Sequence, residues 1–161
     1  MTVIAWDGNI LAADRLNMSG DTLSTSVKIE ELPDGRVMAI VGRTGNGLAL
    51  MRWYREGGDA EKWPAFQEDK DGWVRLIVAF PDGLCVEYEQ VCEPMPVYDS
   101  FMAWGCGKEA ALGAMEMGAT AIRAIEVASK WISGCGRGLD YRVVKNPYRC
   151  AKEVIDAKKK C

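Results

Sequence analysis

Histidine is absent from this 161-residue sequence, and its absence excludes more chemistry than any other feature of the composition. Without histidine the chain lacks the general base of Ser-His-Asp and Cys-His nucleophile pairs, and also the commonest zinc ligand. A hydrolase made from this chain needs another base. Thr2 follows Met1 directly, and after removal of Met1 it would carry both a hydroxyl nucleophile and a free α-amine. Many chains also begin Met-Thr without any catalytic role.

The cysteines form no Cys-x-x-Cys pair and show no spacing typical of a metal site. Scattered cysteines without an export signal predict free thiols in a reducing cytoplasm, and a zinc site would need thiolates alone. The glycine-rich segment 42–47 is not followed by Gly-Lys-Ser or Gly-Lys-Thr, and there is no Rossmann fingerprint or haem motif. We therefore expect neither a metal nor a cofactor. The six cysteines are Cys85, Cys92, Cys106, Cys135, Cys150 and Cys161.

Long apolar runs and a basic excess are missing as well. No run approaches the ~20 apolar residues that span a bilayer, and no signal peptide pattern is present. The sequence therefore predicts a cytoplasmic protein without a membrane partner. The net charge is −3 with both signs interleaved, which argues against nucleic acid as a ligand.

The length and composition predict one globular domain. Hydrophobic residues make up 48% and charged residues 27% of the chain, a balance typical of soluble folded proteins. We expect the domain to cover residues 1–145 and a basic tail, helical or frayed, to cover 146–161. The basic residues of this tail are Arg149, Lys152, Lys158, Lys159 and Lys160.

Asp-Gly pairs at 7–8, 34–35 and 82–83 lie between short runs rich in aliphatic and β-branched residues. This is a strong hairpin signal, because Asp-Gly adopts the turns that join antiparallel strands. Three hairpins are predicted in this way. Their paired segments are 2–6 with 9–13, 27–32 with 36–41, and 73–80 with 84–89.

Two glycine-rich segments precede predicted helices. Residues 42–47 should break a strand and lead into a helix over 48–56, and Gly105-Cys106-Gly107 should lead into a long helix over 108–131. Pro94 and Pro96 predict an irregular connection or an edge strand. A buried strand is expected at 101–104 and the last strand at 139–144. This order favours an α+β domain of two packed antiparallel sheets with helices outside.

Five short segments together resemble a known family by their order and spacing. The segments are 2–8 (TVIAWDG), 11–14 (LAAD), 28–29 (KI), 40–45 (IVGRTG) and 104–107 (WGCG). The chain resembles proteasome-type N-terminal nucleophile hydrolases, and most of all the HslV-like peptidase subunits of bacteria and phages. The resemblance extends over residues 2–144 and implies a four-layer αββα sandwich of two antiparallel sheets flanked by helices.

The resemblance implies roles for individual residues. Thr2 matches the nucleophile, Asp14 the acidic residue beside it, and Lys28 the buried lysine. An ammonium group near the α-amine and hydroxyl lowers their pKa values, and an ion pair with Asp14 would keep Lys28 charged and oriented. Gly42 matches the glycine whose backbone N–H stabilises the oxyanion.

Two positions depart from the family pattern. Cys106 stands where a serine hydroxyl usually contacts the amine of the nucleophile, and a thiol is a weaker hydrogen-bonding partner. Cys106 is then either functional, inert or a source of redox sensitivity. Arg43 stands where a small residue is usual. Ser129 and Ser133 are candidate polar supports, but their loop has no convincing acidic residue.

The resemblance implies a threonine-type endopeptidase that acts on peptides or unfolded proteins. It also implies a homo-oligomeric ring and an ATP-dependent unfoldase as partner. Two alternatives stay open: a catalytically inactive assembly subunit of the same fold, and an N-terminal nucleophile amidase that cleaves a small amide. Trp53, Tyr54 and Trp63 are predicted either to contact a neighbouring subunit or to fill the core.

Overall fold

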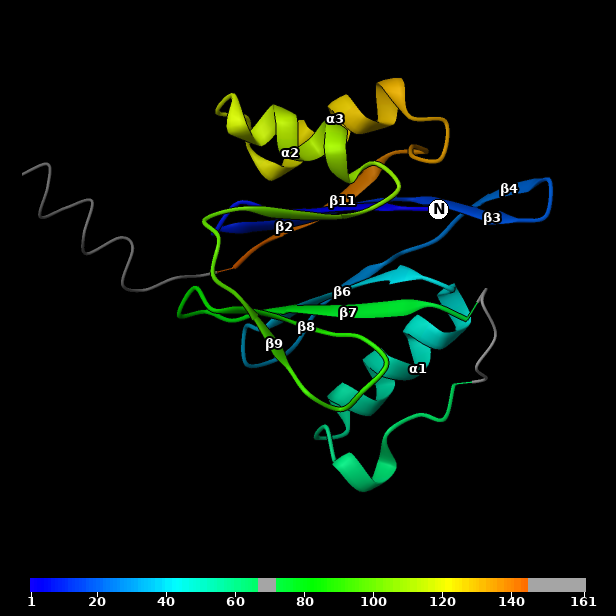
Figure 1. Ribbon diagram of the computed structural model, residues 1–161, viewed down its shortest axis with the longest axis vertical. Helices are drawn as coiled ribbons and strands as arrows, with labels where there is room; N and C mark the ends of the chain where they lie inside the picture. Colours follow the sequence, from blue (N-terminus) through cyan, green and yellow to red (C-terminus); the bar gives the residue numbers. More distant parts are fainter. Residues whose placement is uncertain (67–71, 145–161) are drawn as a thin grey trace, which may run out of the picture.

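The computed structural model describes residues 1–66 and 72–144 (Figure 1). Within them, two main antiparallel sheets face each other and helices cover their outer faces, as Figure 1 shows. This confirms the predicted combination of antiparallel sheets and helices. The basic tail predicted for 146–161 lies outside the described residues.

The first sheet has the strand order β10-β1-β2-β11, with every pair antiparallel. The Asp7-Gly8 turn joins β1 to β2, as predicted, and Oδ1 of Asp7 accepts the N–H groups of Asn9 and Ile10. Gly8 has a φ of 83° there, which favours glycine. The strands are β1 (Val3–Trp6), β2 (Ile10–Asp14), β10 (Met102–Gly105) and β11 (Leu139–Val143).

The second sheet has the order β5-β6-β7-β8-β9. Two of its hairpins turn at the predicted Asp-Gly pairs. β9 is an edge strand that contains Pro96, as expected for a residue that cannot donate a ladder hydrogen bond. The strands are β5 (Ile29–Glu31), β6 (Val37–Gly42), β7 (Val74–Ala79), β8 (Cys85–Tyr88) and β9 (Met95–Val97).

A small two-stranded sheet was not predicted. It consists of β3 (Leu16–Ser19) and β4 (Thr22–Thr25), joined by a two-residue turn at Gly20 and Asp21. Every residue of β4 is exposed, so the segment lacks the alternation of apolar and polar residues that reveals a half-buried strand. The Gly-Asp pair was the one available signal.

Strand alternation divides the first sheet between two cores. Ile4 and Trp6 face the second sheet, whereas Val3 and Ala5 face the helices on the other side. β1 is therefore buried along its whole length, which fixes its register and the position of residue 2 in front of it. A third core lies between the second sheet and α1.

Helix α1 (Thr44–Arg55) begins four residues before the predicted start at 48. Gly45 and Gly47, which favoured a loop, instead lie in the first turn of α1, because the helix packs closely on the sheet there. A Cβ on Gly47 would lie 2.6 Å from the Ile40 side chain. Trp53 and Tyr54 are buried in the core between α1 and the second sheet, and Trp63 packs against it, after the short helix η1 (Ala60–Lys62).

The single long helix predicted for 108–131 is wrong. The structure has two helices, α2 (Lys108–Glu116) and α3 (Ala121–Trp131), which pack together on the first sheet (Figure 1). Gly118 adopts a φ of 90° between them, and the Thr120 hydroxyl accepts the N–H of Arg123 to begin α3. A left-handed glycine followed by a threonine cap is an ordinary helix stop and start.

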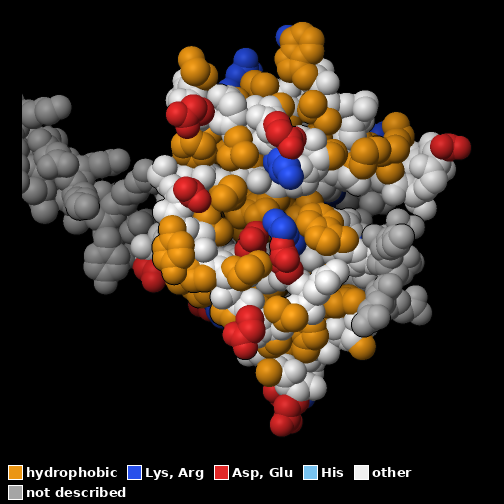
Figure 2. All heavy atoms as spheres, viewed as in Figure 1, with side chains coloured by type: hydrophobic (Ala, Val, Ile, Leu, Met, Phe, Trp, Pro, Cys, Tyr) orange, Lys and Arg blue, Asp and Glu red, His pale blue; other side chains and the backbone are white. Residues whose placement is uncertain are grey.

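The surface mixes charge and apolar groups. On the face drawn in Figure 2, acidic and basic side chains lie scattered among apolar ones. In the described ranges 1–66 and 72–144, none of the helices is both long and apolar enough to cross a membrane.

Candidate functional site

Three polar side chains are buried among the described residues, and they lie together. Thr2, Asp14 and Lys28 are exposed by 3%, 1% and 3%. Thr2 precedes β1, Asp14 ends β2 and Lys28 precedes β5. Because β1 and β2 pair antiparallel with Ile4 opposite Ala13, the start of β1 and the end of β2 meet at the same edge of the sheet.

The Asp14 carboxylate is held by four donors. Its Oδ1 accepts the Val3 N–H at 3.0 Å and the Lys28 ammonium at 2.8 Å. Its Oδ2 accepts the N–H groups of Leu16 at 3.2 Å and Gly136 at 3.0 Å. Both oxygens are satisfied, so the carboxylate has a fixed orientation although it is buried.

The predicted ion pair between Asp14 and Lys28 is present. Besides Asp14, the Lys28 Nζ donates to the carbonyl of Leu16 at 2.6 Å and to that of Met1 at 3.5 Å. Burial lowers the pKa of Lys28, and the Asp14 carboxylate opposes that shift. The ammonium group therefore lies next to the bond between Met1 and Thr2, with a counter-ion on its other side.

The carbonyl of Thr2 is fixed by the glycine-rich turn after β10. The Cys106 N–H donates to this oxygen at 2.8 Å. Gly105 makes the approach possible: its φ is 93°, and a Cβ on it would lie 2.1 Å from the Thr2 oxygen. Any larger residue at 105 would push the start of β1 out of place.

The Cys106 thiol lies in the same turn. Its Sγ is 3.4 Å from the carbonyl oxygens of Thr2 and Gly134 and 3.6 Å from Sγ of Cys135. In the chain that carries Met1, the thiol therefore contacts the backbone of Thr2 at its carbonyl. The pKa of Cys106 is lowered to about 6, and the largest cause is its hydrogen bond with the Cys135 thiol.

Gly42 ends β6 with a φ of 107°, and a Cβ there would lie 2.2 Å from the Trp73 carbonyl. Arg43 donates its N–H to that carbonyl at 2.9 Å. Since hydrogen-bonded and non-bonded pairs alternate along an antiparallel ladder, Gly42 and Val74 form a non-bonded pair. The Gly42 N–H consequently points away from β7, toward the β5 side of β6. On that side the backbone pairing reaches Ile40, whose N–H donates to the Lys28 carbonyl.

A cavity of about 960 Å³ is lined by three of the predicted site residues, Thr2, Gly42 and Cys106. Asp14 and Lys28 do not line it; they hydrogen-bond to the Val3 N–H and the Met1 carbonyl, on either side of Thr2. Met1 also lines the cavity and is 55% exposed, so it covers the place where a free amine of Thr2 would be. Further lining residues are Asn17, Met18, Ser19, Arg43, Thr44, Trp73, Arg75, Trp104 and Lys108.

Comparison with known proteins gives structural matches only, since neither a family model nor a curated protein matches this sequence. BPH of Thiobacillus denitrificans in complex with epoxomicin superposes with a TM-score of 0.67 and 19% identity, over 89% of this chain and 97% of that one. A second structure of BPH gives 0.66 and 20%, over 91% and 98%. Eukaryotic HslV from Trypanosoma brucei gives 0.63 and 18%, over 88% and 97%.

The chain has the fold of HslV. All five residues predicted for the site gather at one edge of the first sheet and the adjoining end of β6 in this HslV-like fold. Ser129 and Ser133 do not join them: Ser133 is exposed, and neither serine hydrogen-bonds to Thr2 within the described residues.

Sequence analysis missed the contribution of the loop after α3 to the site. Gly136 donates to Asp14, and Cys135 lies against Cys106. The signal was a second Gly-Cys-Gly tripeptide at 134–136, which repeats the one at 105–107.

No group of three or more potential metal ligands occurs in the part of the chain that the structure describes.

Proposed function

We propose that this chain is a threonine-type peptidase subunit with the four-layer αββα arrangement of N-terminal nucleophile hydrolases. In this proposal Met1 is removed and Thr2 becomes the N-terminal nucleophile. The observation that carries the proposal is the buried Lys28–Asp14 ion pair next to Thr2, which itself lines a 960 Å³ cavity. The pair hydrogen-bonds to the backbone on both sides of Thr2, at the Met1 carbonyl and the Val3 N–H. Burying an ion pair costs desolvation free energy. A pair with a purely structural role would not need to lie beside residue 2.

The free amine of Thr2 serves as the base. It accepts the proton of the Thr2 hydroxyl, and the oxygen attacks a peptide carbonyl to form a tetrahedral intermediate. The Gly42 N–H, which points away from β7, donates to the developing oxyanion. The carbon–nitrogen bond then breaks, and the leaving amine takes the proton from the Thr2 ammonium.

An ester between Thr2 and the acyl half of the substrate remains. The amine next takes a proton from water, which attacks the ester and regenerates the hydroxyl. Lys28 stays protonated through the cycle because Asp14 balances its charge. Its positive charge favours the neutral amine and the alkoxide-like oxygen of Thr2.

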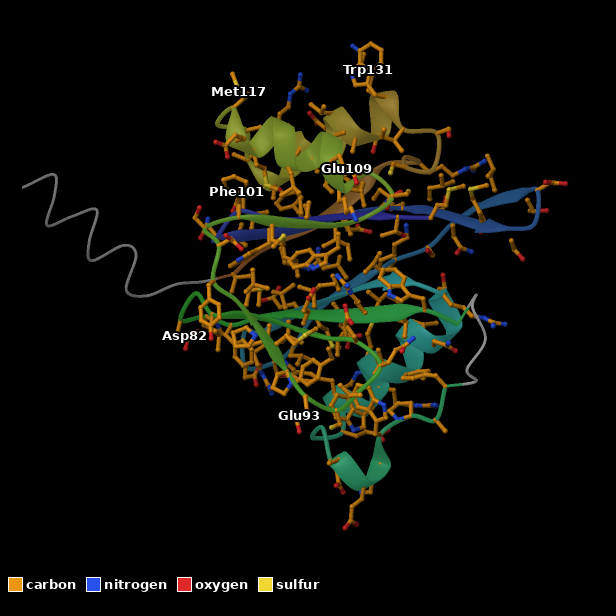
Figure 3. The ribbon with its side chains drawn as sticks, in the orientation of Figure 1. Asp82, Glu93, Phe101, Glu109, Met117 and Trp131 are labelled. Atoms are coloured by element: carbon orange, nitrogen blue, oxygen red, sulfur yellow. The ribbon has the colours of Figure 1, made fainter. Side chains whose placement is uncertain are left out.

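The resemblance to HslV-like subunits also supports a cytoplasmic homo-oligomeric ring that receives unfolded protein from an ATP-dependent unfoldase. Exposed apolar side chains on the helical layer are suitable for subunit contacts. Met117 and Trp131 are 87% and 71% exposed and point away from the sheets in Figure 3. A subunit buried in a ring would cover such groups.

Two observations favour a second candidate, an inactive assembly subunit of the same fold. Cys106 replaces a hydroxyl donor beside Thr2, and the loop 132–138 contains no acidic residue. The retained Thr2, Asp14 and Lys28 favour the peptidase.

The proposal is tested with a form in which a cleavable extension precedes Thr2. We expect the extended form to hydrolyse fluorogenic peptides at least about 100-fold more slowly than the trimmed form, because its amine is blocked and cannot act as base. Cleavage of the extension by a site-specific protease should restore the rate. Equal rates before and after cleavage would contradict the proposal, and no hydrolysis by either form would favour the inactive subunit.

A further inference from the structure

Two Gly-Cys-Gly tripeptides face each other beside Thr2. One, at 105–107, begins at the last residue of β10, and the other, at 134–136, follows α3. The Sγ atoms of Cys106 and Cys135 are 3.6 Å apart. The remaining described cysteines, Cys85 and Cys92, are free thiols elsewhere in the fold.

The glycines on each side make room for the opposite thiol. A Cβ on Gly134 would lie 2.8 Å from Sγ of Cys106, and a Cβ on Gly107 would lie 2.7 Å from Sγ of Cys135. Each thiol thus occupies the space left by a glycine of the other loop. A covalent bond between the sulfur atoms, at about 2.05 Å, requires an approach of roughly 1.5 Å beyond the observed contact.

We propose that Cys106 and Cys135 are a redox pair in which a peroxide oxidises Cys106 and Cys135 resolves the product to a disulfide. The Cys106 sulfur attacks a peroxide oxygen, the oxygen–oxygen bond breaks, and a sulfenic acid and hydroxide form. The Cys135 sulfur then attacks the Cys106 sulfur and loses its proton, and the hydroxyl group leaves as water. The two thiols lose two electrons in total, and the peroxide takes them up.

The surroundings of the two cysteines indicate that Cys106 is the one oxidised by peroxide and Cys135 the one that resolves the product. Cys106 is exposed and lines the cavity, whereas Cys135 is buried. A peroxide therefore reaches Cys106 first. The Cys135 thiol lowers the pKa of Cys106 to about 6, and the same contact raises the pKa of Cys135. An exposed thiolate beside a resolving thiol is the arrangement that reversible thiol oxidation requires.

Formation of the disulfide would also change the geometry around Thr2 and Asp14 and so the rate of peptide hydrolysis, an effect that rests on the proposed function. Gly136, next to Cys135, donates to Asp14, and Cys106 donates its N–H to Thr2. Bringing the two sulfur atoms to bonding distance would move both of these N–H donors, Gly136 and Cys106. We expect the oxidised protein to hydrolyse peptides more slowly, with recovery after treatment with dithiothreitol.

The test is treatment of the full chain with stoichiometric hydrogen peroxide, followed by intact mass measurement and peptide mapping without reduction. We expect a loss of about 2 Da and a peptide that links Cys106 to Cys135, and dithiothreitol should reverse both. Cys92→Ser is the matched control and should form the same link. In Cys135→Ser the link should be absent, and dimedone should trap the sulfenic acid on Cys106.

The peptide map reports the disulfide whether or not the protein hydrolyses peptides, so its result is independent of the proposed function. Oxidation of Cys92 ahead of Cys106 would overturn the inference. Conversion of Cys106 to sulfinic acid without a link to Cys135, or a link from Cys106 to another cysteine, would overturn it as well. If Cys135→Ser does not fold, Cys106→Ser serves the same comparison, with loss of the link and no dimedone adduct at 106.

Discussion

Thr2→Ala is expected to lower peptide hydrolysis by at least about 10³-fold, because it removes the attacking oxygen and leaves the rest of the site in place. Alanine is small, so removal of Met1 is preserved and the N-terminal amine remains. The measurement is the rate of fluorogenic peptide hydrolysis by the purified variant, with its N-terminus determined by mass. Thermal unfolding checks that the fold is intact.

Thr2→Ser is the matched control for this variant. It keeps the hydroxyl and the amine and loses a methyl group from a side chain that is 3% exposed. We expect measurable hydrolysis from Thr2→Ser, whereas Thr2→Ala should show the reduction of at least about 10³-fold. A rate near that of the unmodified chain in Thr2→Ala would show that another group is the nucleophile.

Lys28→Met should have the second largest effect, on both activity and stability. The methionine side chain fills much of the lysine volume but leaves the Asp14 carboxylate buried without its counter-ion. Breaking a buried pair in this way costs on the order of 3–5 kcal/mol in free energy of unfolding. Hydrolysis should be lost, because the charge that favours the neutral amine and the attacking oxygen is gone.

The double variant Asp14→Asn with Lys28→Met separates the two effects. It removes both charges, so much of the lost stability should return, while hydrolysis should stay absent. Denaturant unfolding and peptide hydrolysis measure the two quantities independently. Full activity in Lys28→Met, or in the double variant, would show that the ion pair is a structural feature without a role in catalysis.

Local turn chemistry explains which parts of the fold could be predicted. The Asp-Gly turns at 7–8, 34–35 and 82–83 specify their hairpins through the two residues themselves, and the neighbouring apolar runs fix the strands. The β3–β4 hairpin has a turn signal but no buried face, so its strands have no apolar pattern. Gly118 ends α2 and Thr120 caps α3. The sequence contains both signals, but the apolar residues on either side keep a helical spacing that favoured one continuous helix.

The site is harder to predict, because its contacts join residues that are distant in sequence. The assignment of Asp14 and Lys28 came from the family resemblance, since an aspartate at a strand end and a lysine before a strand are ordinary surface residues by composition alone. The repeated Gly-Cys-Gly tripeptide marks Cys135 in the sequence, but it does not show that Cys135 lies beside Cys106. Their contact depends on how α2 and α3 pack on the first sheet and return the chain to Thr2.

The most direct test of the account is the intact mass of the protein after incubation with a peptide epoxyketone. This inhibitor class reacts with both the hydroxyl and the free amine of an N-terminal threonine, so the adduct requires the two groups that the mechanism uses. We expect loss of Met1 and a single adduct that maps to Thr2. Retention of Met1, or a trimmed chain that forms no adduct, would contradict the claim that Thr2 is a competent N-terminal nucleophile.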